Sequence, residues 1–192
     1  MSGLFTFPWT LAVERLAVPI NQDRPFLSVS IAVLTVSDTR TEKDDRSGDT
    51  LVERLTVAGH TLADRAIVKD DADLIEAQLR GWIADSNIDC VIATGGTGVT
   101  GRDVTPEALD RVCEKKIPGF GELFRWISYQ KIATSTIQSR ADAGVAEGTY
   151  LFVVPGSTGA CRDAWDEILV HQLDNRFMPC NFVELMPRLQ ET

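Results

Sequence analysis

The sequence predicts an α/β fold: a single three-layer domain in which helices flank a mostly parallel sheet, with an antiparallel hairpin at one edge. Runs of apolar and β-branched residues at 28–36, 61–68, 88–93 and 150–154 predict its strands. Amphipathic helical stretches and short links separate these runs, as in right-handed βαβ units. A chain of 192 residues is long enough for one domain with a sizeable core, and short for two.

The first two helices are predicted from capping residues and apolar periodicity. Ser47 is a suitable N-cap for a helix after the first strand, and Gly59 is a suitable C-terminal stop. Asp70 and Asp71 open the next helix, whose apolar residues recur at helical spacing over 72–83. These two helices connect the first three strands.

The middle of the chain predicts two further helices. Thr105 is a candidate N-cap, Pro106 fits the first helical position, and the cations Lys115 and Lys116 suit the helix C-terminus. Segment 117–121 holds a proline and two glycines and predicts a turn, after which another helix begins.

The last third of the chain predicts a hairpin over 145–154, with Glu147 and Gly148 in its turn. A long amphipathic helix is expected at 158–172, and the prolines after residue 177 predict an irregular tail. Three tryptophans on the predicted helices are expected to pack in the core rather than against a cofactor: Trp82, Trp126 and Trp165.

Composition excludes several protein classes. The net charge of −9 makes a general nucleic-acid binder a poor fit, although a local cluster of cations and backbone N–H groups could still hold a small anion. No apolar run approaches the ~18 residues of a membrane helix. The first 27 residues lack the basic start of a signal peptide. The sequence contains no C-x-x-C pair, which argues against a disulfide framework or a zinc ribbon. We therefore expect a cytoplasmic protein.

Polar residues follow each predicted parallel strand, where ligands bind in open α/β sheets. Ser37 and Asp38 follow the first strand, and Asp70 follows the second. A glycine-rich stretch at 94–103 follows the third strand, and a Pro-Gly-Ser segment at 155–157 follows the last. These segments converge on one edge of the sheet, which is the predicted site.

The loop after the third strand contains Gly95, Gly96, Gly98 and Gly101. Glycine lets backbone N–H groups approach an anion closely, and the next helix adds its positive end. This pattern predicts a phosphate or pyrophosphate cradle. The alternative is that one or two of these glycines only form the turn.

Three carboxylates, those of Asp38, Asp70 and Asp103, each follow a predicted strand. Mg²⁺ is usually held by one or two carboxylates together with substrate phosphates, so this grouping beside a phosphate cradle predicts a magnesium site. Each residue also has a structural alternative. Asp38 could cap a turn, Asp70 could cap the following helix, and Asp103 could pair with Arg102.

Segment 96–101 matches G-x-G-x-x-G, yet its context argues against a nicotinamide-dependent oxidoreductase. The match follows the third strand rather than the first, and the helix begins beyond it. No acidic residue ends a strand about 20 residues later. Neither a G-K-[ST] loop nor a G-x-S-x-G elbow is present, which argues against a P-loop enzyme and a serine hydrolase.

A set of segments in register over about 28–183 carries a family resemblance: LTVSDTR, SGDTL, IVKDD, TGGTG with RDVTPEA, IPGFGE, STIQSRADAGV and VVPGST. Through them the chain resembles the MoaB/MogA group of molybdenum cofactor biosynthesis proteins and is similar to the G domain of gephyrin. STIQSRA, PGSTGACRDAW and MPCNF resemble the MoaB branch more than the MogA branch.

The resemblance implies a molybdopterin-binding fold and, in one branch of the group, an adenylyltransferase. There, Mg²⁺-ATP and molybdopterin give adenylylated molybdopterin and pyrophosphate, as the terminal phosphate of the pterin attacks the α-phosphate of ATP. The resemblance implies catalytic and metal-binding roles for Asp70 and Asp103. No protein nucleophile is required.

The resemblance also implies binding roles at the same edge of the sheet. The chemistry of the residues agrees, because Arg102 and the glycine loop could hold a terminal phosphate, and Ser37 and Asp38 lie beside them. The remaining positions are the loop residues Thr94, Gly95, Gly96, Thr97 and Gly98, then Ser139 and Arg140 near the pterin, and Pro155, Gly156 and Ser157 near the nucleotide.

The expected organisation is a domain at 28–183 between an extension at 1–27 and a tail at 184–192. We expect the extension to pack on the domain or on a partner subunit. The resemblance implies a homotrimer or a homohexamer. A second functional hypothesis remains open, in which the protein binds molybdopterin as a carrier or scaffold without turnover.

Overall fold

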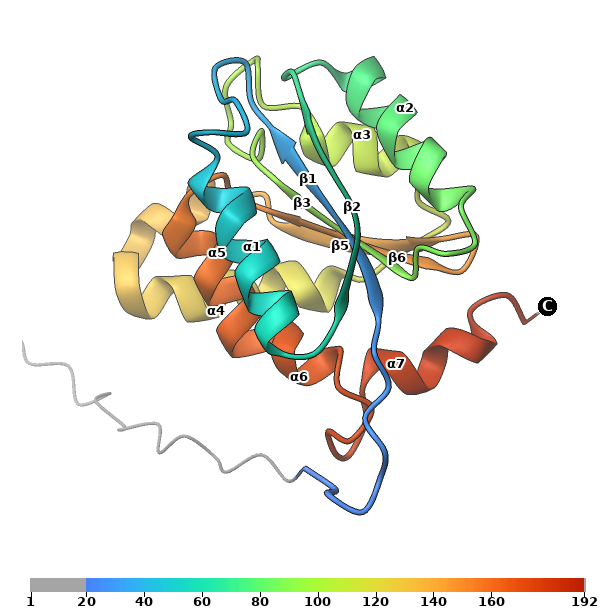
Figure 1. Ribbon diagram of the computed structural model, residues 1–192. Helices are drawn as coiled ribbons and strands as arrows, with labels where there is room; N and C mark the ends of the chain where they lie inside the picture. Colours follow the sequence, from blue (N-terminus) through green and yellow to red (C-terminus); the bar gives the residue numbers. More distant parts are fainter. Residues whose placement is uncertain (1–19, 192) are drawn as a thin grey trace, which may run out of the picture.

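Six strands form the centre of the molecule: β1 (Ser30–Val36), β2 (Thr61–Val68), β3 (Cys90–Thr94), β4 (Lys115–Lys116), β5 (Asp142–Ala146) and β6 (Thr149–Val154). The computed structural model describes residues 20–191. The strand order is β2-β1-β3-β6-β5-β4 (Figure 1). The first three strands and β6 are parallel, whereas β5 pairs antiparallel with β6 and β4. The predicted mostly parallel sheet with an antiparallel edge is therefore confirmed.

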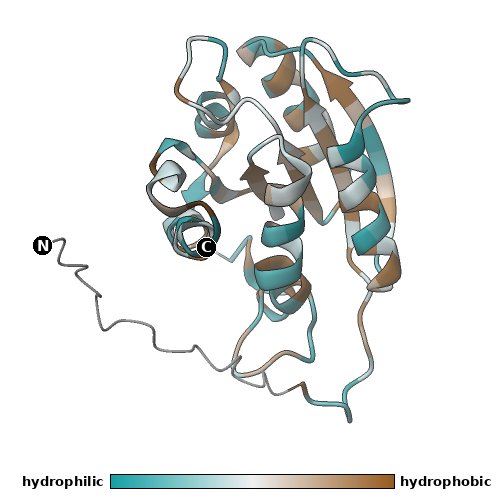
Figure 2. Cartoon of the chain, turned by 90° about the vertical axis from the view of Figure 1, so that its left-hand side faces the viewer, coloured by the Kyte–Doolittle hydropathy of each residue, from teal (hydrophilic) through white to brown (hydrophobic). Residues whose placement is uncertain are grey.

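Helices cover both faces of this sheet and complete the three layers. One face carries α2 (Ala72–Ile83) and α3 (Thr105–Val112), and the other carries α1 (Arg46–Val57), α4 (Pro118–Ile132) and α5 (Thr158–Ala164) (Figure 1). Figure 2 shows mostly apolar strands between helices that carry both hydrophilic and apolar residues. Within residues 20–191, no helix is long and apolar enough to cross a membrane.

The cap of α1 differs from the prediction. Asp45, not Ser47, is the N-cap, because its buried carboxylate accepts a hydrogen bond from the Gly48 N–H at 3.0 Å and pairs with Arg65 at 2.8 Å. Ser47 lies inside the first turn, where its hydroxyl donates to the carbonyl of Gly156 at 2.9 Å. The serine thus ties the helix to the edge of the predicted site.

The other predictions for the first half are closer. Gly59 follows the end of α1 with a φ of 92°, a conformation that glycine adopts readily. Asp71 caps α2 by accepting from the N–H groups of Asp73 and Leu74 at 3.0 and 3.1 Å. Asp70 has no part in that cap, and its carboxylate faces the predicted site instead.

Two predictions for the middle of the chain were wrong. Lys115 and Lys116 form the short strand β4 rather than the end of a helix, because the adjacent backbone pairs with β5. Segment 117–121 was predicted as a turn, but α4 begins at Pro118. Proline fits this position because the first N–H groups of a helix have no partner within the helix.

Two of the three tryptophans that were expected in the core lie there. Trp82 and Trp165 are buried, whereas Trp126 is 55% exposed. Phe120, Phe124 and Ser128 recur every four residues along one face of α4 and are buried, together with Gly121. Trp126 lies on the opposite face, so its expected place in the core was wrong.

The C-terminal part of the chain is more ordered than predicted. The expected helix over 158–172 is confirmed as a continuous helical run from α5 through a π-helical turn (Trp165–Leu169) into α6 (Val170–Gln172). The tail is not irregular, because Asn181 caps α7 (Phe182–Leu185) by accepting from the Glu184 N–H at 2.9 Å. A 3₁₀ turn (Met186–Arg188) follows.

Residues 20–27 pack on the domain, as expected for this part of the extension. The Asn175 side chain accepts from the Leu27 N–H at 2.9 Å and donates to the Pro25 carbonyl at 3.0 Å, and Ile20 forms a bridge with Phe177. Residues 1–19 lie outside the described part of the chain.

Candidate functional site

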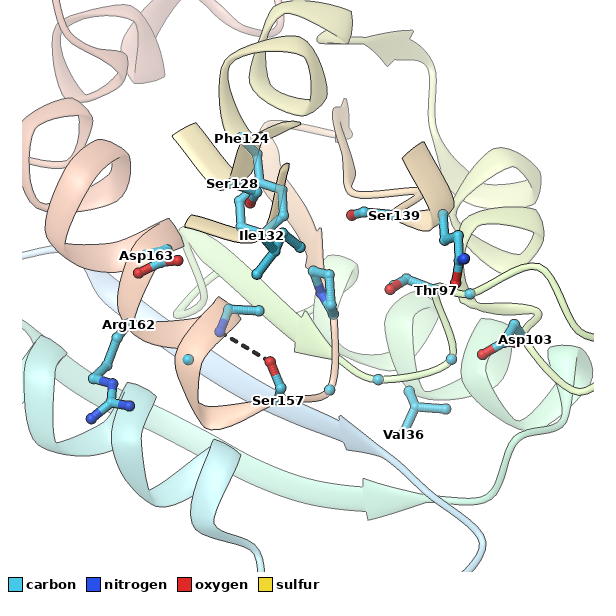
Figure 3. A pocket seen from close by; sticks show the side chains of 18 of the residues that line it. Val36, Thr97, Asp103, Phe124, Ser128, Ile132, Ser139, Ser157, Arg162 and Asp163 are labelled. Atoms are coloured by element: carbon cyan, nitrogen blue, oxygen red, sulfur yellow. Dashed lines mark hydrogen bonds between the residues drawn. The ribbon is translucent and has the colours of Figure 1, made fainter. Parts of the chain in front are cut away.

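A pocket of about 960 Å³ lies beyond the carboxyl ends of the parallel strands (Figure 3). Its volume falls in the range that binds a small organic ligand. Most of the residues predicted from the sequence line it: Ser37, Asp70, Gly95, Gly96, Thr97, Gly98, Asp103, Ser139, Pro155, Gly156 and Ser157. The predicted convergence of these strand ends is therefore what the fold produces.

The glycine loop after β3 requires glycine at two consecutive positions. Gly95 and Gly96 have φ angles of 108° and 61°, in the left-handed region that side chains disfavour. A Cβ atom on Gly95 would overlap the carbonyl oxygen of Val36, and one on Gly96 would overlap the hydroxyl of Thr105. The absence of side chains therefore lets this loop lie directly against the end of β1.

The two candidate catalytic carboxylates flank this loop. A Cβ atom placed on Gly96 would lie 3.0 Å from the Asp70 carboxylate, and one placed on Gly98 would lie 2.7 Å from the Asp103 carboxylate. Thr100 donates to Asp103 from its N–H at 2.9 Å and its hydroxyl at 2.6 Å, which holds that side chain against the loop. Figure 3 shows Asp103 on the glycine-loop side of the pocket, near Thr97.

The pKa values of these carboxylates shift in opposite directions. Burial raises the pKa of Asp70, and the nearby carboxylate of Asp38 raises it further. Hydrogen bonds, led by the Thr100 hydroxyl, lower the pKa of Asp103. Asp70 is thus a desolvated anion beside a like charge, a position that a bound cation would stabilise.

Asp38 and Arg102 lie next to the pocket but outside its lining. Asp38 and Asp70 exchange backbone-to-carboxylate hydrogen bonds at 3.0 and 3.3 Å, and Arg102 forms an ion pair with Asp38. Asp38 therefore joins the loops after β1, β2 and β3. The exposed Arg102 guanidinium lies in this pair at the rim of the pocket, and its predicted contact with a phosphate stays a prediction.

Thr94 and Arg140 also support the pocket from outside. The buried Thr94 hydroxyl donates to the carbonyl of Pro155 at 3.0 Å, which links the end of β3 to the loop after β6. Arg140 donates to the carbonyls of Gly98 and Asp103, both at 2.6 Å. Thr94 thus bonds a backbone carbonyl, and Arg140 bonds two backbone carbonyls and the Glu107 carboxylate. Their predicted ligand contacts stay predictions.

The loop after β6 forms the neighbouring wall of the pocket. Gly156 approaches the glycine loop so closely that a Cβ atom on it would lie 3.0 Å from the Cα of Gly95. Ser157 caps α5, its hydroxyl accepting from the Ala160 N–H at 3.1 Å, a bond drawn in Figure 3. The predicted pterin and nucleotide segments therefore line one continuous pocket.

Sequence reasoning missed the side chains that α4 and α5 contribute. Phe124, Ser128 and Ile132 share one face of α4 and lie above the pocket in Figure 3, while Arg162 lies at its α5 edge. Their four-residue spacing indicates a common helix face, but not that this face meets the site. Other lining cations are Arg40 and Lys131.

Neither a cysteine nucleophile nor a multi-ligand metal cluster is evident in the described chain. Burial raises the pKa of the Cys161 thiol to about 11, so it is protonated at neutral pH. Within residues 20–191, no three His, Cys, Asp or Glu side chains gather as a metal site. A metal ion held by Asp70 and Asp103 would need further oxygen ligands from water or substrate.

Comparison with known proteins places this geometry in a family. The family model described as "Probable molybdopterin binding domain" matches residues 32–175. This chain belongs to that family. It is 50% identical over 157 residues to the molybdenum cofactor biosynthesis protein B of Escherichia coli strain K12, which covers 82% of this chain and 92% of the relative.

Solved structures of the family have the same fold. A crystal structure of a molybdenum cofactor biosynthesis protein B superposes with a TM-score of 0.76 at 42% identity, over 78% of this chain and 94% of the other. The tungsten cofactor synthesizing protein MoaB from Pyrococcus furiosus gives 0.67 at 34% identity, over 74% and 91%. The resemblance inferred from the sequence motifs is confirmed.

The G-x-G-x-x-G match has the context that the sequence predicted. The segment at 96–101 follows β3, the third strand, and α3 begins only at Thr105. In a dinucleotide-binding unit the helix would begin within the motif. The loop therefore belongs to the pocket of the molybdopterin-binding family.

Proposed function

We propose that this protein acts in molybdenum cofactor biosynthesis as a molybdopterin adenylyltransferase, with ATP as its second substrate. The observation that carries the proposal is the shared pocket, in which the glycine loop, the loop after β6 and the carboxylates of Asp70 and Asp103 face one cavity. Two phosphorylated substrates bound on these two loops would meet inside it.

The reaction would depend on positioning more than on covalent chemistry. The terminal phosphate of molybdopterin would attack the α-phosphate of ATP and release pyrophosphate, so no protein nucleophile takes part. The glycine loop would hold one phosphate group through its N–H groups, while residues 155–157 and α5 would hold the nucleotide. Phe124 and Ile132 supply an apolar wall that limits water.

The donor set fits Mg²⁺. Asp70 and Asp103 offer hard carboxylate oxygens on either side of the glycine loop, and Mg²⁺ usually takes one or two carboxylates with water and substrate phosphates. Bound there, the ion would neutralise phosphate charge between two anionic substrates. The net charge of −9 makes such a counter-ion more necessary.

The second candidate function is molybdopterin binding without turnover, as a carrier or scaffold in the same pathway. The same pocket favours it, because pterin binding needs the loops but not catalysis. Release of pyrophosphate separates the two functions.

The decisive experiment incubates the purified protein with molybdopterin, ATP and MgCl₂ and measures adenylylated pterin and pyrophosphate. We expect both products, and neither when MgCl₂ is replaced by EDTA. Pterin that binds without any product would reject the adenylyltransferase and select the carrier.

We also propose that the chain assembles as a homotrimer or homohexamer, as the family resemblance implies. The apolar side chains of Trp126 and Tyr129 on α4 and of Ile137 after it are exposed in the single chain, and Ile137 is 81% exposed. Self-association would remove such a patch from water.

Light scattering at micromolar concentration tests the assembly. We expect the mass of three or six chains, and dissociation in a Trp126→Glu variant. Val57→Glu, at an exposed apolar position on α1, is the matched control and should leave the mass unchanged. A monomeric wild-type protein would contradict the assembly.

A further inference from the structure

Four successive carbonyl oxygens of the glycine loop, those of residues 95–98, accept hydrogen bonds from Thr105 and Arg140, neither of which lines the pocket. Thr105 donates to the first two. Its hydroxyl donates to the Gly95 carbonyl at 2.8 Å, and its N–H donates to the Gly96 carbonyl at 3.0 Å. Thr105 is fully buried, so its hydroxyl is closed to any ligand. Its side chain acts only on the loop.

Arg140 donates hydrogen bonds to the next two carbonyls. Its backbone N–H donates to the Thr97 carbonyl at 3.0 Å, and its Nε donates to the Gly98 carbonyl at 2.6 Å. The remaining guanidinium nitrogens bond the Asp103 carbonyl and the Glu107 carboxylate. The Arg140 side chain is only 32% exposed and forms an ion pair with Glu107, so it is held in place against the loop.

These bonds determine where the N–H groups of the loop point. A trans peptide places the carbonyl of one residue and the N–H of the next on opposite sides. Because the Gly95 and Gly96 carbonyls face Thr105, the N–H groups of Gly96 and Thr97 face away from it, and both residues line the pocket. No described residue accepts a hydrogen bond from either N–H.

We propose that Thr105 and Arg140 are positioning residues that make the glycine loop an anion site. By holding four successive carbonyls away from the pocket, they remove the partial negative charges that would repel a phosphate and present the N–H groups of Gly96 and Thr97 to it. The inference deepens the proposed function, on which it rests for the phosphate as ligand. It replaces the contact role expected of Arg140 with an indirect one.

The experiment measures binding of inorganic phosphate to the full chain, without ATP, pterin or metal, by ³¹P NMR titration. Thr105→Val removes the hydroxyl but keeps the N–H bond to Gly96. We expect its dissociation constant for phosphate to rise about tenfold, since an unpaired buried carbonyl favours a turned peptide. Thr105→Ser restores the donor and should bind within about twofold of wild type.

Arg140→Lys separates positioning from charge. Lysine keeps the positive charge but lacks the planar fork that reaches the Gly98 and Asp103 carbonyls together. We expect phosphate binding to weaken about tenfold despite the retained charge. Arg111→Lys, at an arginine of α3 paired with Asp73 and Glu76, is the matched control and should not change binding.

Circular dichroism and urea unfolding establish that each variant is folded, and Arg140→Lys tests the inference if Thr105→Val does not fold. Folded variants that bind phosphate as tightly as wild type would overturn it, and so would a wild-type protein that binds no phosphate at millimolar concentration. Phosphate binding that depends on both residues in a protein without adenylyl transfer would uphold the inference and reject the proposed function.

Discussion

The two ends of the parallel strands differ in whether their polar groups face a cavity. At the amino ends, buried polar side chains are paired with backbone atoms of neighbouring segments. The Asn175 amide bonds Leu27 and Pro25, and the His60 Nδ1 accepts from the Val29 N–H at 3.1 Å. At the carboxyl ends, the buried hydroxyls of Thr94 and Thr105 are paired in the same way, but loop N–H groups and carboxylates also face a cavity.

This difference separates polar groups that stabilise the fold from polar groups that can bind a ligand. Both ends contain polar groups removed from bulk water, so burial alone does not identify a site. A functional site is indicated instead by hydrogen-bonding groups that are open toward a cavity. The largest effects on chemistry are therefore expected at the carboxyl ends, and effects on stability without loss of chemistry at the amino ends.

The largest expected effect is that of Asp103→Asn. The amide keeps an oxygen acceptor for the Thr100 hydrogen bonds but loses the charge, so adenylyl transfer should fall by at least about a hundredfold while the fold persists. Asp70→Asn should act alike. The measurement is the rate of pyrophosphate release, with thermal unfolding to check the fold.

The matched control lies at the opposite end of the strands. Asp89 accepts from the Ser30 N–H at 2.8 Å, and Asp89→Asn should leave the rate of adenylyl transfer unchanged. An equal loss of rate in Asp89→Asn and Asp103→Asn would remove the distinction between the two ends.

Asn175→Ala tests whether polar groups at the amino ends of the strands affect stability alone. The substitution leaves the Leu27 N–H and the Pro25 carbonyl without their partner, and should lower the free energy of unfolding by about 2 kcal/mol. The rate of the folded protein should not change. Urea denaturation gives the first quantity, and a rate scaled to the folded fraction gives the second.

A smaller effect is expected from His60 as the pH changes. Burial lowers the pKa of His60, although the Asp174 carboxylate opposes this shift. The unfolded histidine therefore binds a proton at a higher pH than the folded one. Stability is full above pH ~6.5 and decreases as pH falls toward the folded pKa, by at most about 1.4 kcal/mol per pH unit.

The His60→Asn variant tests that assignment. The asparagine oxygen can replace Nδ1 as acceptor for the Val29 N–H but does not titrate, so urea stability between pH 7 and 5 should vary less than in wild type. An unchanged pH dependence would assign the effect to other groups.

The layers of the fold could be predicted because their signals are local. Apolar runs and helical stripes mark strands and helices along a short stretch of chain. The errors involve partners distant in sequence. Lys115 and Lys116 form a strand only because β5 lies alongside, and Trp126 is exposed because Phe120 and Phe124 occupy the face of α4 that meets the sheet.

The site shows the same division. Asp70 and Asp103 could be placed because each follows a strand whose carboxyl end was predictable. The positioning role proposed for Arg140 could not be predicted, because it depends on carbonyls of Gly98 and Asp103 that lie far along the chain. Thr105 was expected to cap α3, but it is the first helical residue, and its hydroxyl donates to Gly95.

The close approach of Val36, Gly95 and Gly156 has a consequence for how substrates could change in related proteins. At this point the ends of β1, β3 and β6 are separated by main-chain atoms alone. The spacing between two groups bound on the neighbouring loops is therefore set by the hydrogen-bonded register of three strands. Side-chain substitutions would alter which molecules are held, whereas the distance between the two bound groups would stay constant.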